Sequence, residues 1–167
     1  ELNKNSATKN YVDSGLFKNS VGLIPDLNSN DKNKSGYVIS ANVEDGLHKA
    51  FNVFNSRKGD WQIPSRDHQN DWIKIKCNEP TKIYKFTIRG LAVEDQILKW
   101  AFHGSVNDKD WILLYDGNRE VLDYKFTIFY LSSDIEYYTY YRFSIFLANG
   151  VYTGLNHLQI YSVDKIL

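Results

Sequence analysis

The stretch Gly104-Ser105-Val106-Asn107-Asp108-Lys109-Asp110-Trp111 decides the fold class of this chain. An apolar run ends in Gly-Ser, a group of Asn and Asp follows, and Trp111 opens a new apolar run. Asn and Asp side chains can hydrogen-bond their own backbone and tolerate the left-handed conformation that tight turns require. The stretch therefore predicts two strands joined by a tight connection.

Short runs with a period of two recur on both sides of this turn, and they lie within residues 73–76, 84–89, 124–130, 143–147 and 158–162. β-Branched and aromatic residues at this period, with turn residues between the runs, predict the strands of a sandwich. The best candidate for a short helical turn is residues 44–54, and no strand–helix–strand alternation is present. We therefore expect an all-β fold, an antiparallel β-sandwich of the jelly-roll type.

The composition bounds the organisation of the chain. A length of 167 residues suits one domain with its own core. Residues 1–35 are rich in Asn, Lys and Ser, so we assign them to an N-terminal linker or extension and place the domain at residues 36–167. Lys plus Arg equal Asp plus Glu at 20 each, which argues against a nucleic-acid partner. No apolar run approaches the roughly 20 residues of a transmembrane helix.

Seven pieces of the chain, taken in order, resemble the discoidin or coagulation factor 5/8 type C family, which includes the family 32 carbohydrate-binding modules. The matching pieces are residues 35–41, residues 49–52 followed by Trp61, and residues 71–75, 84–90, 100–111, 140–145 and 152–161. The resemblance covers about residues 36–163. It looks most like versions carried by bacterial surface enzymes and phage tail proteins.

The resemblance implies a galactose-binding-like jelly roll with a ligand patch in the loops at one end. Members usually bind sugars, others bind phospholipid or protein, and many hold a structural calcium. Because fold alone does not assign a ligand, the site must be argued from its residues. By this resemblance the protein is expected outside the cell or on a virion surface.

Sugar recognition needs an aromatic ring face and a few planar polar groups that exchange hydrogen bonds with hydroxyls. The candidates by position are Tyr152, Arg89, Trp61, His68, Arg66 and Asn149. The resemblance places Arg89 and the Tyr152 loop at the ligand end. Two alternatives stay open: Trp61 as a buried wedge beneath its loop, and Arg89 in a salt bridge with Glu94 or Asp95.

The calcium that the resemblance implies would lie near Phe51, Asn52, Asn55 and His157. Asn52 replaces the family's loop carboxylate, and His157 replaces its closing Glu. Calcium prefers carboxylate and carbonyl oxygens, so these two replacements remove most of the charge that would hold it. Backbone carbonyls near Phe51 and Asn55 remain, yet the balance argues against calcium, and no other cofactor is expected.

The sequence does not point to an enzyme. The carboxylate pairs Glu44-Asp45, Glu94-Asp95 and Asp108/Asp110 lie in turn-like segments, and no nucleophile elbow, zinc spacing or phosphate loop is present. We expect a non-catalytic module that attaches a larger protein, a phage tail or bacterial surface protein, to cell-surface glycans, with many copies supplied by an oligomeric parent.

Two other functions remain open at this point. The first is a structural or protein-interaction module that docks the subunits of an assembly. The second is phospholipid binding, which needs apolar spikes beside basic residues and for which Phe54 with Arg57 and Lys58 is the only faint candidate.

Overall fold

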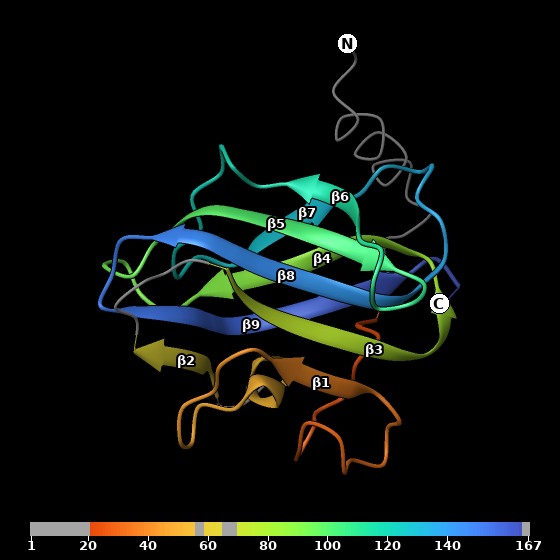
Figure 1. The fold of residues 1–167 in the computed structure, drawn as a ribbon, viewed down its shortest axis with the longest axis horizontal. Helices are drawn as coiled ribbons and strands as arrows, with labels where there is room; N and C mark the ends of the chain where they lie inside the picture. The colour runs from red at the N-terminus through yellow and green to blue at the C-terminus, as the bar shows by residue number, and fades with distance from the viewer. Residues whose placement is uncertain (1–20, 56–58, 65–69, 165–167) are drawn as a thin grey trace.

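The computed structural model describes residues 21–55, 59–64 and 70–164 of the chain (Figure 1). Within these residues it contains one short 3-10 helix, η2 (Ala50–Phe54), in the segment where a helical turn was predicted. The strands are β1 (Val38–Ala41), β2 (Trp61–Pro64), β3 (Asp71–Thr81), β4 (Ile83–Gly90), β5 (Ile97–Ser105), β6 (Ile112–Asp116), β7 (Thr127–Tyr130), β8 (Tyr138–Ala148) and β9 (Tyr152–Ser162).

The strands form two sheets, one behind the other in Figure 1. The larger has the order β1-β3-β8-β5-β6 and the smaller the order β2-β9-β4-β7. All strand pairings among the described residues are antiparallel. The predicted all-β sandwich is confirmed.

Alternate residues of both sheets fill the space between them, as a period of two requires. Phe86 of β4 stacks on Phe102 of β5 with ring centroids 4.3 Å apart, so this pair joins the two sheets. Trp100 of β5 stacks on Tyr115 of β6 at 5.4 Å and meets Phe129 of β7 edge-on at 4.9 Å. These rings account for much of the aromatic content and are core residues.

The connection that decided the fold class closes as predicted. The hydroxyl of Ser105 accepts hydrogen bonds from the backbone N–H groups of Asn107 (3.3 Å) and Asp108 (3.0 Å). Asp108 adopts the left-handed conformation, with φ of 62°. Trp111 lies just before β6, and the guanidinium of Arg142 lies 4.1 Å from its ring centroid. The side-chain oxygen of Asn107 accepts from the N–H groups of Lys109 (3.0 Å) and Asp110 (2.9 Å), so Ser105 and Asn107 stabilise the turn by local bonds.

The run at residues 124–130 differs from its pattern. The alternation predicted that the apolar residues at the even positions 124–130 face the core. Phe126 and Ile128 of that set are instead 54% and 43% exposed, whereas Phe129, at an odd position, is buried. β7 is an edge strand in which Phe129 pairs with Phe86, and this register turns Phe129 inward. A shift of one residue exchanges the two faces of a strand, so pairing decides here rather than pattern.

The described part of the N-terminal segment packs on the domain. Leu23, Ile24 and Leu27 are buried in the common core. The side-chain amide of Gln159 in β9 donates to the carbonyl of Ile24 at 2.7 Å and accepts from its N–H at 3.0 Å. Residues 1–20 lie outside the described residues, and the division at residue 35 stays a prediction.

Candidate ligand-binding site

Two loops meet at the left end of the sandwich in Figure 1, residues 91–96 between β4 and β5 and residues 149–151 between β8 and β9. Asn149 joins them. Its backbone N–H donates to the carbonyl of Gln96 (3.1 Å), and its side-chain oxygen accepts from the N–H of Gln96 (2.9 Å). Its side-chain nitrogen donates to the side-chain oxygen of Gln96 (3.1 Å). The Asn149 carboxamide is therefore committed to holding the loops together.

Asp95 sets the direction in which the chain leaves the second loop. Its Oδ1 accepts a hydrogen bond from the N–H of Tyr152 at 3.3 Å. A Cβ on Gly150 would lie 1.9 Å from the same oxygen, a separation that no side chain tolerates. Gly150 is thus the residue that allows Asp95 to approach Tyr152.

Tyr152 is the first residue of β9, and its side chain is 41% exposed. It pairs with Pro64, which ends β2 and is also exposed. Its backbone is held from both sides, by Asp95 and by β2, while its ring remains accessible. A ring presented in this way is what an aromatic platform for a sugar requires.

Arg89 lies near the end of β4 with an exposed side chain. The ion pairs of the described residues are His48–Asp60, Lys49–Glu44 and Lys74–Asp108, so the salt bridge considered for Arg89 with Glu94 or Asp95 is not formed. Arg89 pairs with His157 on β9, five residues beyond Tyr152. At about 3.3 Å per residue the two positions are roughly 16 Å apart along the strand.

His157 and Phe126 lie beside Arg89, and the sequence pattern did not single out Phe126 as a site residue. The ring of His157 is 5.1 Å from that of Phe126, and its Nε2 forms a 2.8 Å hydrogen bond with the hydroxyl of Thr87. Burial, with a contribution from the charge of Arg89, lowers the pKa of His157 to about 4. His157 is therefore neutral at physiological pH and can accept or donate one hydrogen bond.

The remaining candidate residues are either buried or outside the described residues. Trp61 is fully buried, and its indole N–H donates to the carbonyl of Val43 at 2.8 Å. Its ring therefore offers no face to a ligand, and the buried-wedge alternative describes it. Arg66 and His68 lie outside the described residues. Phe54 is buried and is no apolar spike for a membrane, and Arg57 and Lys58 also lie outside the described residues.

The residues of the implied calcium site do not fit a cation. The side-chain nitrogen of Asn52 donates to the carbonyl oxygens of Leu47 (2.8 Å) and Asp60 (3.1 Å). An N–H donor thus points at oxygens of the kind that would otherwise ligate calcium. The side-chain oxygen of Asn55 accepts from the N–H of Leu27 at 2.7 Å.

Phe51 and His157, the other two residues of the implied calcium site, also have partners within the protein. The N–H of Phe51 donates to the side-chain oxygen of Asn30, and His157 has its partner on β4. No group of three or more His, Cys, Asp or Glu within residues 21–55, 59–64 and 70–164 is arranged to hold a metal.

At least one member of each carboxylate pair singled out in the sequence has a structural partner. Glu44 accepts from the side-chain amide of Asn30 (2.7 Å) and the N–H of Ala50 (2.8 Å), which fixes the start of η2. Asp108 forms an ion pair with Lys74 at 2.8 Å. Together with Asp95 these groups order loops, which is the role that carboxylates in turns usually have.

The sandwich is shared with solved structures of carbohydrate-binding modules. One is the family 32 module of NanJ from C. perfringens in complex with galactose, at 14% identity over 75% of this chain and 93% of that one, with a TM-score of 0.60. The fold is that of the F5/8 type C domains. The F5/8 type C domain of a Bacteroides fragilis protein matches with a TM-score of 0.61 at 12% identity over 81% of this chain and 95% of its own.

A third similar structure is chitosan-binding module 1 from a chitosanase/glucanase of Paenibacillus sp. IK-5. It matches with a TM-score of 0.65 at 12% identity, over 84% of this chain and 98% of its own. No family model and no curated protein matches the sequence. The similar structures therefore establish the jelly roll, whose sequence pattern was recognised above, and leave the ligand to be argued from the site.

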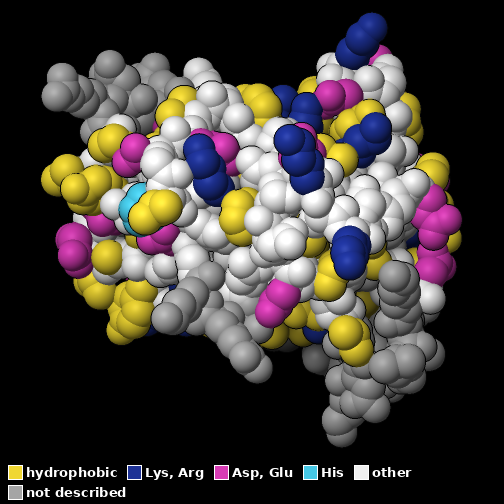
Figure 2. Space-filling model, turned by 90° about the horizontal axis from the view of Figure 1, so that it is seen from below, with side chains coloured by type: hydrophobic (Ala, Val, Ile, Leu, Met, Phe, Trp, Pro, Cys, Tyr) yellow, Lys and Arg dark blue, Asp and Glu magenta, His cyan; other side chains and the backbone are white. Residues whose placement is uncertain are grey.

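The distribution of charged side chains on the surface agrees with the even charge balance of the sequence. Figure 2 shows acidic and basic side chains scattered over the face seen from below, with polar surface between them. In the part of the chain that the structure describes, no helix is both long and apolar enough to cross a membrane.

Proposed function

We propose that this domain is a non-catalytic glycan-binding module, in which the ring of Tyr152 stacks on one sugar unit of a glycan and Arg89, farther along the sheet, supplies hydrogen bonds to the hydroxyls of another unit. The observation that supports it most is the Tyr152 ring, exposed on a backbone that Asp95 and Gly150 hold in place. Planar guanidinium donors and an aromatic face are the groups by which proteins orient sugars. The similarity in fold to modules that bind galactose and chitosan also supports a sugar ligand.

The proposed role is attachment of a larger protein, a phage tail or bacterial surface protein, to cell-surface glycans. The protein would then act outside the cell or on a virion surface. One ring and a few hydrogen bonds gain little beyond the cost of association, so the affinity for one sugar is expected to be roughly millimolar to high micromolar. Useful attachment then comes from several copies of the parent protein.

The test combines a glycan array with an NMR titration of each sugar that binds. The variant Tyr152→Ala is expected to weaken binding about tenfold, because it removes one aromatic contact. Tyr124→Ala is the matched control, since Tyr124 is a similarly exposed tyrosine in another loop. Absence of binding across host-surface sugars, or equal loss in both variants, would contradict the proposal.

A second candidate function is docking of a neighbouring subunit, and one surface favours it. Large apolar side chains of one segment are exposed beside and within the edge strand β7: Val121, Tyr124, Phe126 and Ile128. Edge strands and contiguous apolar surface are common features of interfaces. Sedimentation velocity distinguishes the two functions. A domain that binds glycan and remains monomeric at high concentration would contradict docking between copies of this chain.

A further inference from the structure

A pocket of about 200 Å³ lies at the other end of the sandwich from Tyr152. Tyr152 begins β9, and Ser162, which lines the pocket, ends it. Ten residues of extended strand separate these positions by about 33 Å. At about 30 Å³ per water molecule the pocket has room for about six or seven waters, or for one small ring with its substituents.

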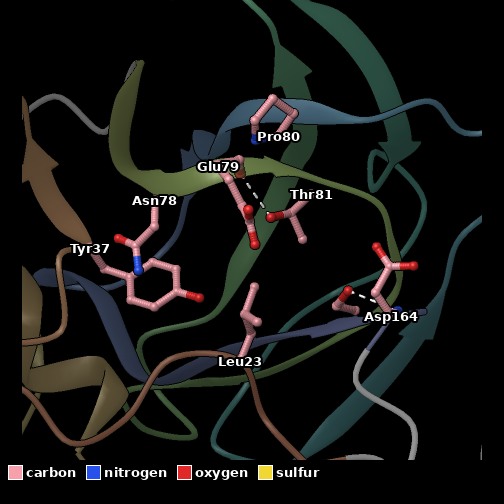
Figure 3. A pocket seen from close by; sticks show the side chains of 8 residues that line it. Leu23, Tyr37, Asn78, Glu79, Pro80, Thr81 and Asp164 are labelled. Carbon is pink, nitrogen blue, oxygen red and sulfur yellow. Dashed lines mark hydrogen bonds between the residues drawn. The ribbon is translucent and has the colours of Figure 1, made fainter.

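The polar lining comes from segments far apart in the sequence. Tyr37 precedes β1, Glu79 and Thr81 belong to the end of β3, and Asp164 follows β9. Figure 3 shows the Tyr37 hydroxyl, the Glu79 carboxylate and the Thr81 hydroxyl pointing toward one space, with Asp164 at its side. Leu23 and Pro80 supply apolar walls.

Tyr37 is the first indication that this pocket takes a ligand. Its side chain is only 7% exposed, and its hydroxyl has no hydrogen-bond partner among the described residues. The ring is therefore fixed by packing, while its hydroxyl opens onto the pocket, where water or a ligand can pair with it. Burial, with the charges of Cys77 and Glu79, raises the pKa of Tyr37 to about 12, and the phenol is therefore neutral.

The charge of the pocket is the second indication. Neither Glu79 nor Asp164 takes part in any ion pair of the described residues. The hydroxyl of Tyr137 is the side-chain group that approaches Asp164, at 3.5 Å. Lys82, three residues after Glu79, donates instead to the carbonyl of Ser133 at 3.1 Å. Two carboxylates thus line one pocket, and no cation of the described part of the chain is paired with either.

These groups suit an organic cation better than a metal. Calcium takes six to eight oxygen ligands, whereas this pocket offers two carboxylates and no group of three metal-ligating residues in the described chain. An ammonium group has three N–H donors and no acceptor. Two carboxylates and a phenolic oxygen are three acceptors for it. Thr81 and Asn78 donate to the backbone carbonyls of Glu79 and Ser35, so their side-chain oxygens offer further acceptors for hydroxyls.

We propose that this pocket binds a primary ammonium group carried on a small hydroxylated ligand, of the amino-sugar class. The carboxylates of Glu79 and Asp164 accept from the ammonium, the hydroxyl of Tyr37 completes the set, and the walls of Leu23 and Pro80 contact the carbon frame. The site is independent of Tyr152.

The test is an NMR titration of the ¹⁵N-labelled 167-residue chain in mildly acidic buffer, in which the amine probe is protonated. D-glucosamine is the probe. N-acetylglucosamine keeps the ring without the charge, and putrescine keeps the charge without the ring. The expected result is a saturable shift of the Asn78, Glu79, Thr81 and Asp164 resonances by glucosamine, at least about tenfold weaker with either control, because a charge-assisted bond or the hydroxylated frame is missing.

Variants separate this site from the loop end. Glu79→Gln combined with Asp164→Asn is expected to weaken glucosamine binding about tenfold or more, and Tyr37→Phe to weaken it less, while all remain folded because these side chains make few internal bonds. Glu136→Gln, an exposed carboxylate in the loop before β8, is the matched control and leaves binding unchanged.

Several outcomes would overturn the proposal. They are no saturable shift at this end, equal binding of N-acetylglucosamine, equal binding of putrescine, or full binding by the double variant. Loss of the response in Tyr152→Ala would assign it to the loop end instead. Retention of glucosamine binding in Tyr152→Ala, together with a failed glycan array, would support this pocket and contradict the proposed glycan function separately.

Discussion

Asn52 and Asp60 are joined by a hydrogen bond from the side-chain nitrogen of Asn52 to the backbone carbonyl of Asp60, at 3.1 Å. The same nitrogen donates to the carbonyl of Leu47. The carboxamide therefore draws together two carbonyl oxygens that would otherwise repel each other. Where the family resemblance implied a cation, an uncharged side chain closes the loop by itself.

The first prediction concerns this bond. Asn52→Asp should lower the free energy of unfolding by about 1–3 kcal/mol without calcium, because a carboxylate cannot donate to the two carbonyls. Millimolar calcium should restore part of the melting temperature of Asn52→Asp, since a carboxylate and carbonyls are hard-cation ligands. Differential scanning fluorimetry with calcium and with EDTA measures both effects.

Asn52→Ala is the control for that experiment, and it should lose stability with no response to calcium. The unsubstituted domain should melt at the same temperature in calcium and in EDTA. A clear rise with calcium in the unsubstituted domain would show that the loop binds a cation after all.

Gly150→Ala should disturb the Tyr152 loop. The new methyl would meet Asp95 Oδ1 at 1.9 Å and the Cα of Asp95 at 2.6 Å, so the loops must separate. A cost of about 1–3 kcal/mol is typical of such overpacking, and it should appear in urea denaturation. Glycan binding should weaken as well, because Tyr152 loses its fixed position. Gly46→Ala is a useful comparison, since no atom lies within 4 Å of its added Cβ, although its positive φ adds some strain.

Trp61 should matter for stability and not for affinity. Trp61→Phe removes the indole N–H that Val43 accepts and leaves a void, which together should cost about 1–3 kcal/mol of unfolding free energy. The dissociation constant for a bound glycan should stay within about twofold, because the ring contacts no solvent. A large loss of affinity at unchanged stability would place Trp61 in the binding site.

Stability should fall as the pH is lowered through the range in which His157 titrates. Its pKa is about 4 in the folded domain, lowered by burial and by Arg89, against an ordinary value of 6.5. Between these values the unfolded chain binds more protons, so stability is fully present above about pH 6.5 and is lost as the pH falls toward 4. The loss attributable to His157 should reach on the order of 2–3 kcal/mol.

Urea denaturation at several pH values measures this slope. His157→Gln keeps a hydrogen-bonding group near Thr87 and does not titrate, so its slope in this range should be smaller. His103→Gln should act in the same direction, because burial also lowers the pKa of His103. An unchanged slope in His157→Gln would show that other groups cause the acid sensitivity.

The comparison between sequence and structure is clearest at residues 124–130. The alternation there correctly predicted a strand, yet β7 is shorter, and the larger apolar set lies outside. Period two is a property of the local chain and cannot say which face is inside. The pairing of Phe129 with Phe86, which is 43 positions away, settles that question.

The candidate site was predictable only in part. For Tyr152, flanked by glycines in a late loop, an exposed ring was expected, and the ring is exposed; that it contacts a ligand stays a prediction. The interaction of Asp95 with Tyr152 spans 57 residues, and no local pattern announces it. The same holds for Asn149, whose carboxamide proves to be a tie between loops.

What the sequence determined by itself was the sandwich and the turn at residues 104–111, because periodicity and turn chemistry are properties of neighbouring residues. The replacement of carboxylates at Asn52 and His157 is what the family resemblance implied. The tertiary structure alone decided that Trp61 is buried, that Asp95 and Gly150 position Tyr152, and that Tyr37, Glu79 and Asp164 share a pocket. Antiparallel pairing brings together residues far apart along the chain, and the energy of those contacts depends on a register that only the closed sandwich defines.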